Sequence, residues 1–178
     1  MTRENDKVLK LAWGLTSAAP ITNESFEDRI DRHMPRSDDL TLLVLKGHLL
    51  VEEGLDALLR VLLKNPEALA PANLNLFSRL CIVRALFGNT EMIDAAIALN
   101  NLRNKLAHHL EHPQVERLTN DFISRFEKRF SAKINDPSDA LQMSLARRLR
   151  RCINYLCGYF NGAAEGYLDG RAGRPPRL

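Results

Sequence analysis

The sequence predicts an all-α protein, folded as a single-domain, up-down helical bundle. Nearly every apolar stretch has the three- and four-residue spacing of a helix, and no stretch alternates between apolar and polar residues as a strand does. Hydrophobic residues make up 45% and charged residues 26% of the 178 residues, which is an ordinary globular composition. That length is sufficient for one hydrophobic core, and we find no internal repeat or second domain boundary.

Two short helices are expected first, Lys7 to Leu15 and Glu24 to His33, the second stopped by Pro35. Residues 1–36 are therefore predicted to be an N-terminal helical extension. The chain opens with mixed charges and lacks the apolar stretch of a secretory signal, so a cytoplasmic protein is expected. No apolar run reaches the roughly 18 residues that span a bilayer, so no membrane partner is expected.

A long helix is predicted next, at the centre of the bundle. Ser37 or Asp38 is expected to cap it, because these side-chain oxygens accept from the free amides of a first turn. The helix runs to about Lys64, and its apolar residues cover most of the circumference, which indicates a core helix. Three charged residues, spaced seven apart, give it one polar line: Lys46, Glu53 and Arg60.

The middle of the chain predicts two more helices. Residues 69–75 are expected to be irregular, and Leu76 to Phe87 to form a shorter helix that ends at Gly88-Asn89. The helix from Glu91 to about Leu110 follows, and Pro113 marks its end because the residue before a proline avoids the helical region.

Two helices complete the predicted bundle, which covers residues 37–169. Gln114 to Phe130 has amphipathic spacing, and Ser138 to about Leu168 is expected to be a long C-terminal helix. Residues 170–178 combine Gly, Pro and Arg and are predicted to be a basic disordered tail.

Positive charge concentrates in the C-terminal third. From Arg117 onward twelve Lys/Arg stand against six Asp/Glu, a charge of +6, while the preceding residues carry 13 against 16, or −3. This asymmetry is compatible with nucleic-acid binding. Three cysteines match no zinc pattern, so we expect buried, reduced thiols and no metal site: Cys81, Cys152 and Cys157.

The most informative cluster is Arg103, Asn104 and His108, late in the near-apolar stretch Ala95 to Leu110. The charged, planar fork of arginine fits a phosphate and histidine titrates near neutral pH, so the cluster indicates chemistry at a phosphodiester. On a helix Arg103 falls in line with the apolar stripe, but Arg103 and His108 point about 140° apart, with about 7.5 Å between them along the axis. They converge only through the reach of arginine, a helix end near Pro113 or a partner subunit.

A structural alternative accounts for the same residues. Arg103 would pair with Glu52 or Glu53 of the central helix and tie two core helices together. His108 and His109 would then be helix-end histidines, favoured by the negative end of the helix dipole.

The segment Leu102-Arg103-Asn104-Lys105-Leu106-Ala107-His108-His109 resembles the signature of the HEPN superfamily, an arginine followed after four to six residues by a histidine. The order of helices from Asp38 to Phe130 is also similar to that family, and it resembles the layout of the mannitol operon repressor group. The resemblance implies an all-α bundle that forms a homodimer and brings two motifs together in a cleft.

The resemblance also implies a chemistry, because active members of the family are endoribonucleases that need no metal or other cofactor. His108 would act as general acid or base on the ribose 2′-hydroxyl or the leaving oxygen. Arg103 would stabilise the charge of the pentacovalent phosphate, and Asn104 would position the phosphate or the histidine. Three further residues are candidates, one as the alternative histidine and two that either support the same cleft or form a local hydrogen bond: His109, His48 and Glu52.

The C-terminal helix carries a basic strip. Four arginines within about 160° of arc, opposite the apolar side, are candidates for RNA binding: Arg147, Arg148, Arg150 and Arg151. Tyr155 and Tyr159 flank the strip at positions suited to base stacking. The alternatives are a solvated face with local ion pairs and a membrane-surface helix. Three glycines spaced four apart would permit close approach of a second copy's helix: Gly158, Gly162 and Gly166.

The function that we expect is a metal-independent endoribonuclease, a toxin or defence effector that an antitoxin or other regulatory protein holds in check. The alternative is a noncatalytic transcriptional regulator or protein-interaction module. The first requires a titrating His108, whereas the second requires only the surface of the bundle.

Overall fold

All regular secondary structure among the described residues is helical. In the computed structural model of the chain, these residues are 26–107, 113–134 and 143–171. They form, in chain order, α2 (Phe26–His33), α3 (Leu40–Leu62), a 3-10 helix η1 (Pro66–Ala72), α4 (Leu76–Phe87), α5 (Glu91–Ala107), α6 (Val115–Ile134) and α7 (Leu145–Arg171). The prediction of an all-α bundle is confirmed. The helix expected at Lys7 to Leu15 lies outside the described residues.

Side-chain caps set the starts of two helices. The Leu42 amide donates to Oδ1 of Asp39 over 3.0 Å, so Asp39 caps α3, and the predicted caps Ser37 and Asp38 are wrong. Asn75 caps α4 in the same way, and the bounds predicted for this helix are confirmed. Gly88 follows α4 with a φ of +82°, a conformation that favours glycine.

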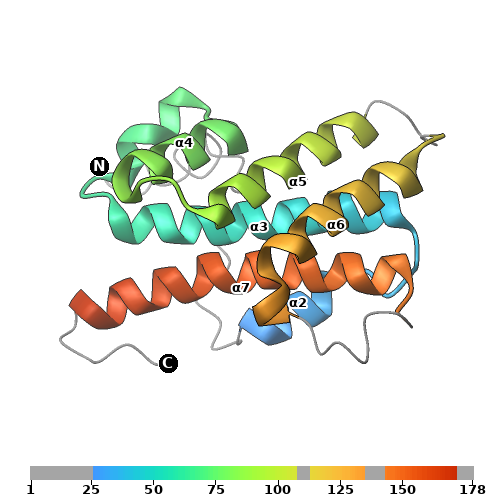
Figure 1. The fold of residues 1–178 in the computed structure, drawn as a ribbon. Coiled ribbons are helices and arrows are strands. Elements are labelled where there is room, and N and C mark those ends of the chain that lie inside the picture. Colours follow the sequence, from blue (N-terminus) through green and yellow to red (C-terminus); the bar gives the residue numbers. More distant parts are fainter. Residues whose placement is uncertain (1–25, 108–112, 135–142, 172–178) are drawn as a thin grey trace.

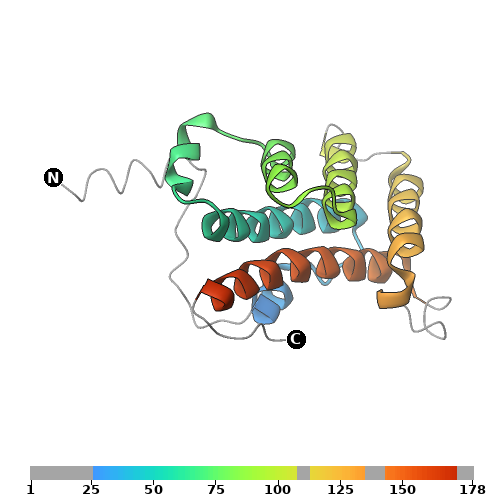
Figure 2. The same cartoon turned by 60° about the vertical axis from the view of Figure 1, so that its left-hand side comes forward.

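Helices α3 and α7 lie side by side at the centre of the molecule and run parallel (Figures 1 and 2). Their close approach depends on glycines of α3. A Cβ at Gly47 would lie 2.5 Å from Cδ1 of Ile153, and one at Gly54 would lie 2.7 Å from the amide nitrogen of Asn161. Because glycine has no side chain, Ile153 and Asn161 of α7 pack directly against the backbone of α3 at these points.

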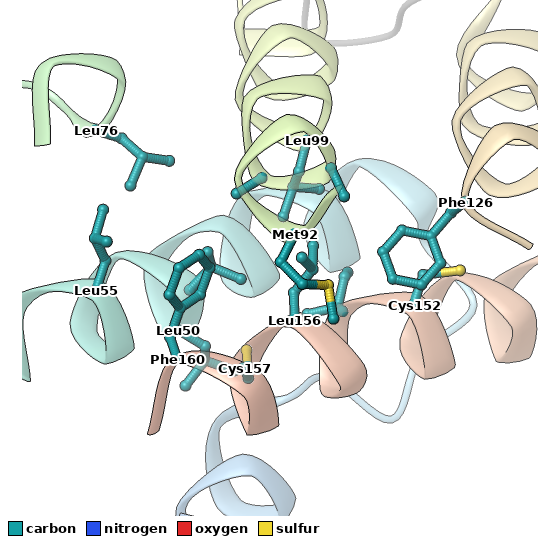
Figure 3. Close-up of a cluster of buried hydrophobic side chains, with 14 of the residues drawn as sticks. Leu50, Leu55, Leu76, Met92, Leu99, Phe126, Cys152, Leu156, Cys157 and Phe160 are labelled. Carbon is teal, nitrogen blue, oxygen red and sulfur yellow. The ribbon is translucent and has the colours of Figure 1, made fainter. Parts of the chain in front are cut away.

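The other helices cover this central pair. Helices α4 and α5 lie on the side of α3 away from α7, and α2 lies against α7 (Figures 1 and 2). Figure 3 shows buried side chains from α3, α5 and α7 filling the space between them, with Phe126 entering from α6. Ile30 of α2 and Met34, which follows that helix, belong to the same core, so the described part of the predicted N-terminal extension packs onto the bundle.

Several element boundaries differ from the sequence prediction. Helix α7 begins at Leu145 rather than Ser138, because Oγ of Ser144 accepts from the Arg147 amide, and it continues to Arg171, into the predicted tail. Helix α6 continues past Phe130, where the backbone kinks (φ −115°, ψ 16°). The 3-10 helix η1 occupies part of the segment predicted to be irregular. Residues 172–178 of the predicted tail lie outside the described residues.

The three cysteines differ in their surroundings. Cys152 and Cys157 are buried, and burial raises the pKa of each thiol to about 12, so both stay protonated at neutral pH. Cys81 is exposed, so its predicted burial is wrong: it lies on the outer side of α4. Within the described ranges, none of the helices combines the length and apolar character that crossing a membrane requires.

Candidate functional site

Arg103 and Asn104 lie near the end of α5, at the edge of its buried stripe. Met92, Leu99 and Leu106 are buried, whereas Arg103, in line with them, is half-buried and Asn104 is exposed. The predicted position of Arg103 beside the core is therefore confirmed. Nη1 of Arg103 donates to Oδ1 of Asn104 over 3.1 Å, so the two side chains present one polar surface. His108 and His109 lie outside the described residues, and their roles stay predictions from the sequence.

His48 lies behind this surface, on α3, and is only 6% exposed. Its Nε2 lies 3.1 Å from Oδ1 of Asn100, so in the tautomer with hydrogen on Nε2 the ring donates across to α5. Its Nδ1 lies 3.9 Å from a carboxylate oxygen of Glu52. Burial lowers the pKa of His48, and the positive charge of Arg103 contributes in the same direction, although Asn100 and Glu52 oppose the shift. His48 is therefore neutral at neutral pH.

Glu52 belongs to an ion-pair cluster that joins α3 to α4. Nη1 of Arg79, a buried residue, lies 2.8 Å from Oδ1 of Asp56 and 3.2 Å from Oε1 of Glu52. Burial raises the pKa of Asp56, although the charge of Arg79 opposes the shift. Glu53, one position along α3, pairs instead with Arg29 of α2.

Arg103 takes no part in these ion pairs. Glu52 is engaged by Arg79 and Glu53 by Arg29, so the alternative in which Arg103 pairs with either glutamate is wrong. The arginine that ties two core helices together is Arg79. Among the described residues, Arg103 has no carboxylate partner, and its recorded hydrogen bond is the one to the neutral Asn104.

Asn100 and Arg79 were not predicted to belong to this region. Asn100 precedes Asn104 by four residues and therefore shares its face of α5, a spacing from which it could have been found. No such signal exists for Arg79, because its partners lie 23 and 27 residues away on another helix. Arg79 comes close to Glu52 and Asp56 only through the packing of α4 against α3.

The basic strip predicted on α7 is largely engaged within the molecule. Arg148 donates to Glu127 of α6 from Nε (3.0 Å) and Nη2, and Arg150 donates from Nε to the Pro35 carbonyl (3.1 Å). The prediction of a continuous exposed strip is therefore wrong, because these two arginines tie α7 to its neighbours. Nη1 of Arg151 lies 3.3 Å from Sδ of Met143. Of the four, Arg147 is the exposed one.

The residues expected beside the strip differ in their surroundings. The ring of Tyr155 packs against Phe126 and Phe130, with centroid distances of 6.1 and 5.7 Å, so it belongs to the core margin rather than to a stacking surface. Tyr159 is exposed. The three glycines of α7 line an open face, where an added Cβ would meet nothing within 4 Å: Gly158, Gly162 and Gly166. None of the described residues approaches them, and the predicted contact with a second copy stays a prediction.

In the part of the chain that the structure describes, no group of three or more His, Cys, Asp or Glu side chains is placed to hold a metal ion. The region around the end of α5 therefore consists of a half-buried arginine, an amide and a neutral buried histidine. Comparison of the chain with protein-family models, curated proteins and solved structures found no match.

Proposed function

We propose that the protein is a metal-independent endoribonuclease of the HEPN type, a cytoplasmic homodimer that acts as a toxin or defence effector under the control of a partner protein. Arg103, Asn104 and His108 would form its reactive centre. The observation that carries the proposal is the half-buried guanidinium of Arg103, which has no carboxylate partner among the described residues.

An unpaired charge at the margin of a core is costly, because it loses part of its hydration without gaining a counter-ion. By contrast, Arg79 and Arg148 each bind carboxylates. The neutral state of His48 gives Arg103 no compensation either. A bound anion would supply the missing partner, and a phosphate matches the planar fork of arginine.

His108 and Arg103 have separate roles in the proposed reaction. The ribose 2′-hydroxyl loses its proton and its oxygen bonds to the adjacent phosphorus, while the bond from phosphorus to the 5′-oxygen breaks and that oxygen takes up a proton. His108 is the group that moves these protons. Arg103 stabilises the charge that develops on the phosphorane oxygens. The products are a 2′,3′-cyclic phosphate and a 5′-hydroxyl, and the nucleophile comes from the RNA itself.

The test is cleavage of end-labelled, structured RNA by the purified chain in EDTA. Arg103→Ala and His108→Ala are expected to remove cleavage while keeping the thermal midpoint and helical content of the wild type. Arg60→Ala, the loss of an exposed arginine on α3, is the control that keeps activity. If the folded wild type leaves several RNAs intact, or if both variants cleave as it does, the proposal fails.

A noncatalytic regulator or interaction module is the second candidate, and an exposed apolar end of the molecule favours it. Phe87 and Tyr167 are 49% and 41% exposed, with ring centroids 6.3 Å apart, and they line a hollow of about 140 Å³. Leu86 and Leu168 are also exposed. Apolar surfaces of this kind mark protein contacts. Under this candidate Phe87→Ser, and not Arg103→Ala, would remove partner binding in a pull-down with the cognate partner.

A further inference from the structure

A groove lies between α5 and α6, on the side of α5 that carries Ala98, Leu102 and Lys105. It encloses about 310 Å³, within the range of small-ligand sites. The two helices run antiparallel here, because Arg129 of α6 pairs with Glu91 and Asp94 at the start of α5. The lining residues of α5 extend from Asp94 to Lys105, which are eleven positions apart, so the groove is about 16 Å long at 1.5 Å per residue.

The charges of the groove are only partly paired. Asp94 is engaged by Arg84 and Arg129, and Asp121 lies 3.7 Å from Arg117. Lys105 and Arg125 also line the groove, and both are exposed. Among the described residues, neither takes part in an ion pair or hydrogen bond. Within the described ranges, Lys105 and Arg125 are therefore cations without a counter-ion, while Asp94 and Asp121 already have counter-ions.

Between the cations the lining is apolar and amide-bearing. Leu102 and Phe122 form a buried floor, Leu118 is half-buried, and the exposed side chain of Asn101 offers both a donor and an acceptor. Such a surface suits a ligand that combines repeated negative charges with flat, weakly polar groups. A single-stranded oligonucleotide has this chemistry, since its phosphates alternate with sugars and bases.

We propose that the groove between α5 and α6 binds a single-stranded segment of RNA, with Lys105 and Arg125 holding its phosphates. The proposal rests on the endoribonuclease proposed above and gives it a path for the substrate strand. At 100° per residue Lys105 points about 200° away from Arg103 on α5, so a strand held at this end of the groove reaches Arg103 and Asn104 by passing around the helix. A groove of about 310 Å³ holds only a short stretch of one strand, so the proposed segment is unpaired.

The experiment separates binding from cleavage by using a 2′-O-methyl oligoribonucleotide of about 12 nucleotides, which lacks the attacking hydroxyl. Fluorescence anisotropy gives its Kd at several salt concentrations. Lys105→Glu and Arg125→Glu are each expected to weaken binding about threefold to tenfold and to reduce the slope of log K against log salt by about 0.7, the value for one lost single-strand phosphate contact. Lys105→Arg keeps the charge and should restore wild-type binding.

Lys128→Glu is the matched control. Lys128 is an exposed residue of α6 outside the groove, and its substitution changes the charge by the same amount. It should bind as the wild type does. Equal losses for Lys128→Glu, unchanged binding by both groove variants, or binding of an acidic peptide but not of the oligonucleotide would overturn the proposal. If the oligonucleotide binds in the groove but ordinary RNA is not cleaved, the endoribonuclease proposal fails and the groove proposal stands.

Discussion

Two arginines lie near the same part of α3 but in opposite surroundings. Arg79 is buried against Glu52 and Asp56, whereas Arg103 is half-buried and bonded to a neutral amide. Removing Arg79 leaves two poorly solvated carboxylates without a counter-ion, while removing Arg103 leaves only the exposed amide of Asn104, which water can solvate. The first is a structural residue, and the second is free to bind a ligand.

We therefore expect Arg79→Ala to lower the free energy of unfolding by about 3 kcal/mol, and Arg103→Ala to change it by less than about 0.5 kcal/mol. Urea denaturation of the two variants beside the wild type measures both. A large loss of stability in Arg103→Ala would show that its side chain holds the fold together and would weaken the proposed nuclease.

His48 gives the stability a pH dependence of known sign. Its pKa in the folded protein is lowered from 6.5, mainly by burial, so below 6.5 the unfolded chain binds more protons than the folded one. The free energy of unfolding should rise with pH in that window and stop rising above it. His48→Gln keeps an amide beside Asn100 but cannot titrate, so its rise should be shallower.

Urea denaturation of both proteins from about pH 5 to pH 7 measures this difference. The pKa of Asp56 is raised from 3.8, so this group makes the free energy of unfolding fall as the pH rises above 3.8. Because Asp56 is present in both proteins, its effect cancels in the comparison. Parallel curves for wild type and His48→Gln would show that His48 does not control this window.

At the scale of the elements, the contact between α3 and α7 should be sensitive to one methyl group. Gly47→Ala would place a Cβ 2.5 Å from Cδ1 of Ile153, and relieving that overlap is expected to cost about 1–3 kcal/mol. Gly158→Ala adds the same methyl to the open face of α7, where the better helix propensity of alanine should stabilise by about 0.5–1 kcal/mol. Thermal unfolding of the pair tests this, and a stabilised Gly47→Ala would contradict the close packing.

Local signals explain which helix boundaries could be predicted. Leu76–Phe87 was predicted at both ends because Asn75 and Gly88 carry start and stop signals in the sequence itself. The start of α7 was missed because Ser138 and Ser144 offer the same capping chemistry, and spacing alone does not choose between them. Asp39, one of several polar residues before α3, posed the same choice.

At the scale of the whole molecule, the proposed homodimer is open to a direct test. In sedimentation velocity the wild type should have twice the chain mass of 20.1 kDa. If the glycine face of α7 is the contact, Gly162→Leu should yield monomers without loss of stability, because no described residue opposes a side chain there. Asn120→Leu on the exposed face of α6 is the control that should remain dimeric. A monomeric wild type would contradict the dimer.

The pairing of side chains between helices is the part that sequence reasoning could not supply. The position of Arg103 beside the core follows from 3.6-residue periodicity and was predicted. The engagement of Arg148 and Arg150 was not, because their partners lie on α6 and on the segment before α3, at separations of 21 to 115 residues. Periodicity assigns a face to each residue, but only the assembled bundle decides what that face meets.

The parallel pairing of α3 with α7 also orders events during synthesis. Residues 63–144 separate the two helices, so the ribosome delivers α3, α4 and α5 well before the helix that covers the other side of α3. Translation adds about 5–20 residues per second, and contacts between distant segments form late. The scaffold behind Arg103 is thus completed only as α7 emerges. For a nuclease that attacks RNA, such an order would keep each nascent chain inactive beside its own messenger until α7 has been made.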